Sequence, residues 1–366
     1  MRILFAGGGT AGHINPAISV ADYMKEKDAD FEALFVGTKR GLETRLVPSA
    51  GYRIRYIDIC GFDRKHLLKN VSVLYKLQKS KIDCKKIIKE FKPDAVVATG
   101  GYVSGPVLMA AKKLGVPAII HEQNVYPGLT VRGSEKYVDY VAVSFDETVS
   151  LMKNADKCVV TGNPIRPEIL KADKESARQQ LGLSEKPFVL VFGGSLGAQR
   201  INNTMIGVIK RLAESDDFTL LFGTGDRNYQ KVMAQLEEAG VTLNDNIKVV
   251  PYINNMSSVM AAADVVVARS GAITVSEICA LGKPSVLIPS PNVVRNHQEQ
   301  NARELEKQNA AAVITEDILT DELLYNKICE MTSDKASLSA MSKNAKRIAK
   351  TNALEEIYNI VMKIKK

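Results

Sequence analysis

The sequence is built from short apolar runs that do not alternate with polar residues. They read RILFAGGG, EALFVGT, DAVVATGG, PAIIHEQN, YVAVSF and KCVVTGNP in the first half, and FVLVFGGS, FTLLFGTG, IKVVPYI, DVVVARSG and PSVLIPS in the second. Continuous Val/Ile/Leu runs indicate strands buried on both faces, as in parallel sheets covered by helices. Because small residues and then a helical pattern follow each run, we expect an α/β fold with doubly wound parallel sheets.

This pattern begins twice along the chain, which predicts two domains. Glycine clusters, FAGGGTAG at residues 5–12 and FGGSLGA at 192–198, each stand where a strand leads into a helix. Pro164 and Pro167 mark a linker between them. We expect domains at 1–163 and 164–345, and a C-terminal helix at 346–366 that packs back toward the first domain. Ligands of two such sheets would bind in a cleft between the carboxyl ends of their strands.

Composition limits the class of protein. The 366 residues are 45% hydrophobic and 25% charged, a globular balance. Five cysteines without a C-x-x-C pair suggest a reduced, cytoplasmic protein, and a strand directly after Met1 leaves no room for a signal peptide. The most apolar stretch, PVLMAAKKLGVPAII, contains two lysines, so no membrane-spanning helix is expected. The net charge of +8 favours anionic partners such as lipid head groups, nucleic acid or phosphorylated substrates.

The first glycine cluster has several possible roles. Gly7, Gly9 and Gly12 match the spacing of a dinucleotide-binding loop, in which glycines let the backbone approach a phosphate. The acidic residue that would hold the ribose is missing, and the second strand is followed instead by Lys39 and Arg40. Those cations suit a 2′-phosphate, so NADP is weakened but stays open. Another phosphate ligand, or a tight turn without ligand, also fits.

His13 follows this loop in the first turn of the expected helix. A helix N-terminus is positive, which favours the neutral imidazole and therefore a working base at neutral pH. The alternative is a histidine that only caps or packs locally. Its place at the mouth of the expected cleft, in a chain with four histidines, favours a chemical role.

The most specific stretch is ADVVVARSGAITVSEICALGKPSVLIPSP, followed by NHQEQNA. Glu277 lies three residues after Thr274, so it is either a capping-box glutamate or a carboxylate that accepts two ribose hydroxyls. The Gln298 amide could both donate to and accept from sugar hydroxyls.

With these segments in view, the chain resembles the MurG family of peptidoglycan N-acetylglucosaminyltransferases. The matching segments are GGGTAGHINPA, TGGYVSGP, HEQNVYPGLT, TGNPIRPEI, GGSLGAQRIN, ARSGAITVSEI and HQEQNA. The resemblance implies the GT-B glycosyltransferase fold, with two Rossmann-like domains. It implies transfer of N-acetylglucosamine from UDP-N-acetylglucosamine (UDP-GlcNAc), held mainly by the second domain. The acceptor, bound to the first domain, would be the 4-hydroxyl of the muramoyl sugar in undecaprenyl-pyrophosphoryl-N-acetylmuramoyl-pentapeptide (lipid I), and the product lipid II.

The resemblance also implies site residues. The donor-binding positions would be Thr10, Ala11, Gly12, Asn124, Arg166, Ser195, Ile253, Ala272, Ile273, Thr274, Glu277 and Gln298. Ile253 would meet the uracil through its backbone, and Glu277 would hold the ribose. Ser195 and the glycines at 193–197 would receive the diphosphate, with Arg166 adding positive charge. The acceptor diphosphate would lie on Gly8, Gly9, Gly101, Tyr102 and Ser104.

Members of this family invert the anomeric centre, which implies direct displacement without an enzyme nucleophile. The step needs a base, for which His13 is the candidate, and stabilisation of the departing UDP. Since no D-x-D or other carboxylate cluster is present, we expect no tightly bound metal and no cofactor. Two positions depart from the family: Ala11 stands where a second glycine is common, and Val131 where asparagine is usual.

Residues 61–92 carry ten Lys/Arg against three Asp/Glu, among the apolar side chains of Leu67, Leu68, Val71, Leu74, Tyr75 and Leu77. Such a stretch suits an anionic membrane, so we expect peripheral attachment to the cytoplasmic side of the plasma or inner membrane. The alternative is an ordinary surface helix whose apolar side faces the core.

Three other functions stay open at this point. An NADP oxidoreductase would explain the first loop but not the second glycine loop or SGAITVSE. A UDP-sugar epimerase of the same fold would have a similar nucleotide-binding domain but would not bind a lipid acceptor. A non-catalytic phosphate- or nucleic-acid-binding protein would account for the charge. However, no RNA or DNA module is visible, and stacking aromatics are not interleaved with the basic residues, so nucleic acid is not an expected partner.

Overall fold

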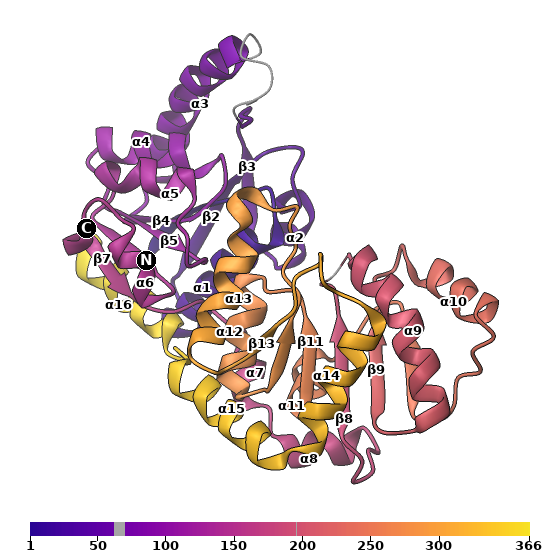
Figure 1. The fold of residues 1–366 in the computed structure, drawn as a ribbon. Helices are drawn as coiled ribbons and strands as arrows, with labels where there is room; N and C mark the ends of the chain where they lie inside the picture. Colours follow the sequence, from indigo (N-terminus) through magenta and orange to yellow (C-terminus); the bar gives the residue numbers. More distant parts are fainter. Residues whose placement is uncertain (62–69, 195) are drawn as a thin grey trace. The chain divides into compact units, whose positions relative to one another are not determined.

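The computed structural model describes residues 1–61, 70–194 and 196–366 (Figure 1). The chain forms two compact units. The first consists of residues 1–165 together with 350–366, and the second of residues 166–349. The chain therefore passes between the units twice.

The first unit contains a parallel sheet of seven described strands in the order β3-β2-β1-β4-β5-β6-β7. The strands are β1 (Arg2–Gly7), β2 (Glu32–Gly37), β3 (Arg53–Tyr56), β4 (Ala95–Gly100), β5 (Ala118–Glu122), β6 (Tyr140–Val143) and β7 (Cys158–Val160). The helices are α1 (Ala11–Lys27), α2 (Glu43–Ser49), α3 (Asn70–Phe91), α4 (Ser104–Lys113), α5 (Leu129–Ser134), α6 (Asp146–Ser150) and α16 (Ala353–Ile364), with short 3₁₀ turns η2 (Glu135–Tyr137) and η3 (Ala155–Lys157).

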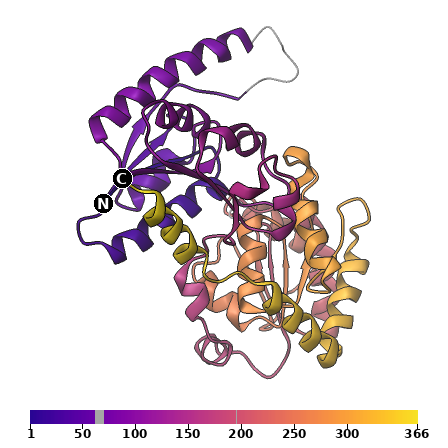
Figure 2. The same cartoon turned by 90° about the vertical axis from the view of Figure 1, so that its left-hand side faces the viewer.

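Alternate side chains of its strands are buried on opposite faces of the sheet. Ile3 and Phe5 belong to a core that includes α1 and α16, and Leu4 and Ala6 to a core that includes α3 and α4. The C-terminal helix α16, yellow in Figure 2, thus completes a face of the first unit, with Ile357 fully buried. Strands buried on both faces explain why the sequence shows no alternation.

The second unit repeats this plan. Its parallel sheet has six described strands in the order β10-β9-β8-β11-β12-β13. The strands are β8 (Phe188–Phe192), β9 (Thr219–Gly223), β10 (Ile247–Val250), β11 (Val265–Ala268), β12 (Ser285–Leu287) and β13 (Ala312–Val313). The helices are α7 (Pro167–Lys171), α8 (Lys174–Gln180), α9 (Gln199–Ser215), α10 (Tyr229–Glu238), α11 (Met256–Ala262), α12 (Ala272–Leu281), α13 (His297–Lys307), α14 (Asp321–Ser333) and α15 (Lys335–Ile348), with η4 (Val294–Asn296).

The predicted fold class is confirmed, and every apolar run listed above forms a strand. One local prediction is wrong: residues 346–366 are not one helix. The chain leaves helical geometry at Ala349 (φ −66°, ψ 133°), so α15 ends at Ile348 and α16 begins at Ala353. The two helices belong to different units.

Strand order determines where ligands can bind. In the first sheet the chain moves from β1 outward to β2 and β3, then returns to β4 on the other side of β1. The loops that follow β1 and β4 therefore meet at the carboxyl edge of the sheet, the position where such folds bind ligands. The loops after β8 and β11 hold the equivalent position in the second sheet.

Within the described part of the chain, no helix has both the length and the apolar composition needed to cross a bilayer. The five cysteines are free; Cys84 and Cys279 are buried and the other three partly buried.

Candidate functional site

The two glycine loops of the first unit touch through their backbones. Gly9, Gly100 and Gly101 adopt positive φ angles of 88°, 110° and 79°. A Cβ atom at Gly101 would lie 2.4 Å from the carbonyl oxygen of Gly8, so only glycine fits there. The loops after β1 and β4 thus form one backbone surface.

The side chain of Ser104 connects these two loops by hydrogen bonds. Its hydroxyl donates to the carbonyl oxygens of Ala6 (3.0 Å) and Gly100 (2.8 Å) and accepts from the Gly100 amide (3.1 Å). The residue is fully buried. The Ser104 hydroxyl is therefore used inside the protein and supports the two loops, while the place of Ser104 at the acceptor diphosphate stays a prediction.

His13 lies where these loops meet. Its Nδ1 is 3.2 Å from the Gly8 carbonyl oxygen and 3.3 Å from the Thr10 hydroxyl, and its carbonyl oxygen accepts from the Thr99 hydroxyl at 2.6 Å. The ring lies against Gly100, where a Cβ atom would be only 3.0 Å from Nε2. A carbonyl can only accept, so Nδ1 carries the proton of the neutral ring and Nε2 carries the lone pair. This tautomer presents Nε2 as a base.

Near this site, the HEQN segment forms an internal network. His121 is buried, its Nε2 donates to the Gly162 carbonyl (2.9 Å), and its Nδ1 accepts from the Gln123 amide (3.0 Å). The same Gln123 amide donates to the Thr99 carbonyl at 2.9 Å. Burial lowers the pKa of His121 to about 4. The segment therefore supports β4 and the turn that holds His13.

Asn124 is held by the neighbouring Glu122. One carboxylate oxygen of Glu122 accepts from the backbone amide (2.9 Å) and side-chain amide (3.2 Å) of Asn124, and the other from the Gly128 amide (2.7 Å). Burial raises the pKa of Glu122, while these hydrogen bonds oppose that shift. Asn124 is partly exposed at the carboxyl end of β5.

The residues at the two positions that depart from the family pattern fit their surroundings. Ala11 begins α1 without a positive φ angle, so glycine is not required. Val131 is buried in the core of the first unit, so the position makes no polar contact through its side chain.

The second unit has its own glycine loop between β8 and α9. Gly197 (φ 72°) lies so close to the next loop that a Cβ atom would be 1.9 Å from the Thr224 carbonyl oxygen. The first turn of α9 contains no acidic residue, which suits an anion at this helix N-terminus. Ser195 lies outside the described residues.

Glu277 and Arg166 form an ion pair. Arg166 Nη2 and Nε lie 3.0 and 3.1 Å from the same oxygen, Oε1, of Glu277. The Glu277 side chain is 7% exposed and that of Arg166 50%. Burial raises the pKa of Glu277, and the Arg166 charge opposes that shift. The capping-box alternative is excluded, because the N-cap of α12 is Gly271, six residues before Glu277.

The start of α12 is tied to Gln298. The Ser270 hydroxyl donates to the Gln298 backbone carbonyl (2.8 Å), and the Gln298 side-chain oxygen accepts from the Ser290 amide (2.9 Å). The side-chain oxygen of Gln298 is therefore used inside the protein. Ala272, Ile273 and Thr274 form the first turn of α12. Ile253 is buried against Gly223, which leaves its backbone for ligand contacts.

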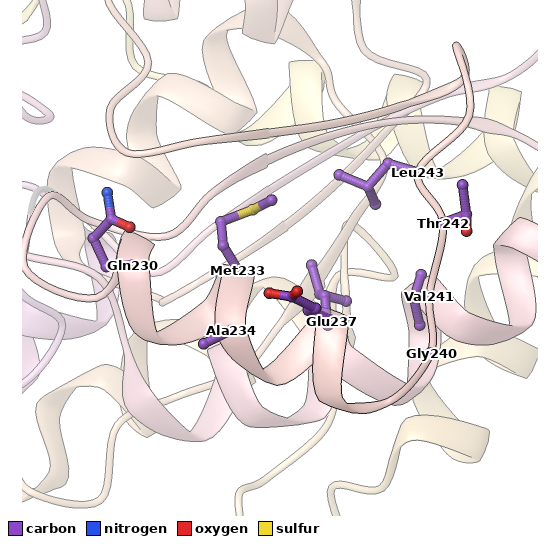
Figure 3. A pocket seen from close by; sticks show the side chains of 9 residues that line it. Gln230, Met233, Ala234, Glu237, Gly240, Val241, Thr242 and Leu243 are labelled. Carbon is purple, nitrogen blue, oxygen red and sulfur yellow. The ribbon is translucent and has the colours of Figure 1, made fainter.

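A hollow of about 580 Å³ lies elsewhere in the second unit (Figure 3). It is formed by α10 and the segment after it, and none of the predicted site residues line it. The described residues also contain no group of three or more His, Cys, Asp or Glu side chains suited to a metal ion.

Comparison with known proteins defines the class first. The chain matches the glycosyltransferase family 28 N-terminal domain over residues 3–143 and the family 28 C-terminal domain over residues 188–357. Two relatives are both named UDP-N-acetylglucosamine–N-acetylmuramyl-(pentapeptide) pyrophosphoryl-undecaprenol N-acetylglucosamine transferase. The one from Acetivibrio thermocellus is 47% identical over 100% of this chain and 99% of its own. The one from Caldanaerobacter subterraneus is 48% identical over 100% of both chains.

The crystal structure of Acinetobacter baumannii MurG aligns over 99% of both chains with a TM-score of 0.80 and 27% identity. A UDP-GlcNAc 2-epimerase from Neisseria meningitidis, at 14% identity and a TM-score of 0.68, shares the fold alone. The chain belongs to the MurG family of GT-B glycosyltransferases. This membership disfavours the oxidoreductase and epimerase alternatives.

We predict that His121 makes the stability of the first unit pH-dependent. Its pKa is about 4 in the folded protein and about 6.5 in an unfolded chain. The stabilisation is therefore complete above pH ~6.5 and is lost as the pH falls toward 4, by about 3 kcal/mol. Denaturant unfolding of wild type and His121→Gln between pH 4 and 7.5 should give curves that converge at low pH. His297→Gln, at a partly exposed ring, is the control. Parallel curves for wild type and His121→Gln would contradict the prediction.

Proposed function

We propose that this chain transfers N-acetylglucosamine from UDP-GlcNAc to the 4-hydroxyl of the muramoyl sugar of undecaprenyl-pyrophosphoryl-N-acetylmuramoyl-pentapeptide. The observation that best supports this proposal is the 47% sequence identity, over both domains, to a relative whose name states this transfer. Both units also bring their candidate residues to the carboxyl edge of a parallel sheet, the usual ligand position in this fold class.

The second unit is the proposed donor site. Arg166 occupies Oε1 of Glu277, so the ribose hydroxyls would be received at Oε2. The N-termini of α9 and α12, neither with an acid in its first turn, would face the diphosphate, and half-exposed Arg166 would add positive charge. Gln298 would donate to the sugar, and the backbone of Ile253 would meet the uracil. The proposed donor-binding residues also include four of the first unit: Thr10, Ala11, Gly12 and Asn124.

The first unit is the proposed acceptor site. His13 Nε2 would remove the proton of the acceptor hydroxyl as that oxygen attacks the anomeric carbon, and UDP would leave in the same step with inversion. Helix N-termini and Arg166 would stabilise the departing charge, without a metal ion. The acceptor diphosphate would lie at the N-terminus of α4, beside Gly101 and exposed Tyr102.

The assay for this proposal supplies UDP-GlcNAc and a lipid I analogue and measures the disaccharide product. His13→Asn keeps a donor near the Gly8 carbonyl but removes the base. We expect kcat to fall about 10²–10⁴-fold with the donor KM within about twofold, since the uridine diphosphate is proposed to bind residues of the second unit. No product from the wild-type protein would refute the function. A kcat for His13→Asn within about threefold of wild type would refute the role of His13 alone.

The exposed side of α3 is the proposed membrane surface. Cys84, Ile87, Ile88 and Phe91 pack into the core of the first unit, so this part of the helix has the inner face that the surface-helix alternative requires. The opposite side carries exposed lysines together with Tyr75 and Ile82, which are 72% and 67% exposed. Figure 1 shows α3 projecting beyond its sheet. Leu67 and Leu68 lie outside the described residues, and the side chains of Val71 and Leu74 are likewise not described.

We predict that reversing the charges of Lys79, Lys86 and Lys89 to glutamate weakens binding to phosphatidylglycerol vesicles at least about a hundredfold, at about 1 kcal/mol per cation. The matched control reverses three exposed lysines of the second unit, Lys210, Lys231 and Lys248, for the same change in net charge. Vesicle sedimentation measures both. Equal weakening by the two sets would show that only net charge matters and would remove α3 from the proposal.

A further inference from the structure

A carboxylate of the protein lies inside the first glycine loop. Glu43, the first residue of α2, is fully buried. Its Oε2 accepts from the Gly9 amide at 2.9 Å, and its Oε1 accepts from the amide (2.9 Å) and hydroxyl (2.8 Å) of Thr38. Glu43 therefore joins the loop after β1 to the loop after β2.

The surrounding glycines make room for this carboxylate. A Cβ atom at Gly8 would lie 2.8 Å from Glu43 Oε1, and one at Gly41 only 1.9 Å from Oε2. At Gly37 it would lie 2.6 Å from the Glu43 Cγ atom. The Gly9 amide is thus already bound to an anion, the Glu43 carboxylate. Burial alone would raise the pKa of Glu43, but the hydrogen bonds from Gly9 and Thr38 outweigh it and lower the pKa, so the group is ionised at neutral pH.

One peptide group connects Glu43 to His13. The Gly9 N–H that donates to Glu43 and the Gly8 C=O that faces His13 Nδ1 at 3.2 Å belong to the same peptide bond. In a planar trans peptide the N–H and C=O bonds point in opposite directions and their dipoles add, so the carboxylate and the imidazole lie at opposite ends of one rigid, polarisable group. A strong acceptor on the N–H increases the negative charge on the carbonyl oxygen, because hydrogen bonds in series strengthen one another.

We infer that Glu43 is a positioning residue for the transfer reaction, acting on His13 through the Gly8–Gly9 peptide. Glu43 holds that peptide in the orientation set by the left-handed Gly9. The Gly8 carbonyl then holds the Nδ1–H of His13, which leaves the ring lone pair on Nε2 and makes Nε2 a stronger base. The arrangement resembles an acid–imidazole pair with a peptide group between its members. The inference rests on the proposed function and on His13 as its base.

The test is a double-mutant cycle of Glu43→Gln and His13→Asn. A glutamine cannot accept from both Gly9 and Thr38, because its NH₂ group would meet one of these donors. We expect Glu43→Gln to lower kcat about tenfold, or 1.4 kcal/mol, with the donor KM within about twofold. In the His13→Asn background the same change should alter the residual kcat by less than about twofold, because the two residues act as a unit.

Glu135→Gln is the matched control. Glu135 is also buried in the first unit and accepts from the backbone amides of Lys153 (3.0 Å) and Asn154 (2.9 Å), so it reports what losing such a carboxylate does to folding. Its kcat should remain within about twofold of wild type. An equal tenfold loss from Glu43→Gln with and without His13, or no loss at all, would overturn the inference. Absence of product from the wild-type protein would instead overturn the function.

A measurement on the wild-type protein covers the case in which Glu43→Gln does not fold. Nitrogen NMR of ¹⁵N-histidine-labelled protein, with His13 assigned from the signal lost in His13→Asn, reports which ring nitrogen holds the proton. The inference requires the proton on Nδ1. A neutral His13 protonated on Nε2 would contradict it.

Discussion

Close contact between backbones of glycine loops is the constraint on which the candidate site depends. At Gly101 the nearest atoms belong to the Gly8 peptide, and at Gly197 to the Thr224 carbonyl, so a side chain at either position would separate two loops. Such contact makes the loops rigid at the carboxyl edges of the sheets. Backbone amides and helix N-termini at these edges are then oriented so that they can bind phosphates. His13 gains its orientation from the same contact, since Gly8 supplies its partner and Gly100 the space for its ring.

Much of the polar character of these loops serves the protein itself. Glu43, Glu122 and Glu135 are buried carboxylates that accept from backbone amides of loops, as a bound anion would. Ser104, His121 and Gln123 are similarly engaged. These side chains show that part of what the motifs contain supports the loops rather than a ligand. A glycine-rich loop therefore does not by itself identify a phosphate site.

The sequence predicted the sheets well because strands buried on both faces leave continuous apolar runs. It missed β3 and β13, since β3 exposes Arg53, Arg55 and Tyr56 at one edge of its sheet and β13 has only two residues. It also missed the break at Ala349, where no proline or glycine marks the end of α15. The contact between Glu43 and the first glycine loop was not predicted, because Glu43 lies 34 residues from Gly9 along the chain. The signal that could have revealed it is Gly37 and Gly41 just before it, glycines that no tight turn alone explains.

The central proposal is that the second unit binds the uridine diphosphate and that the first unit binds the acceptor. A crystal structure of the protein with UDP-GlcNAc tests it most directly. The account predicts the uracil against the backbone of Ile253, the ribose hydroxyls on Glu277 Oε2, and the diphosphate at the N-termini of α9 and α12. A uridine bound instead at the loop of Gly9, with Glu277 still paired only to Arg166, would contradict it.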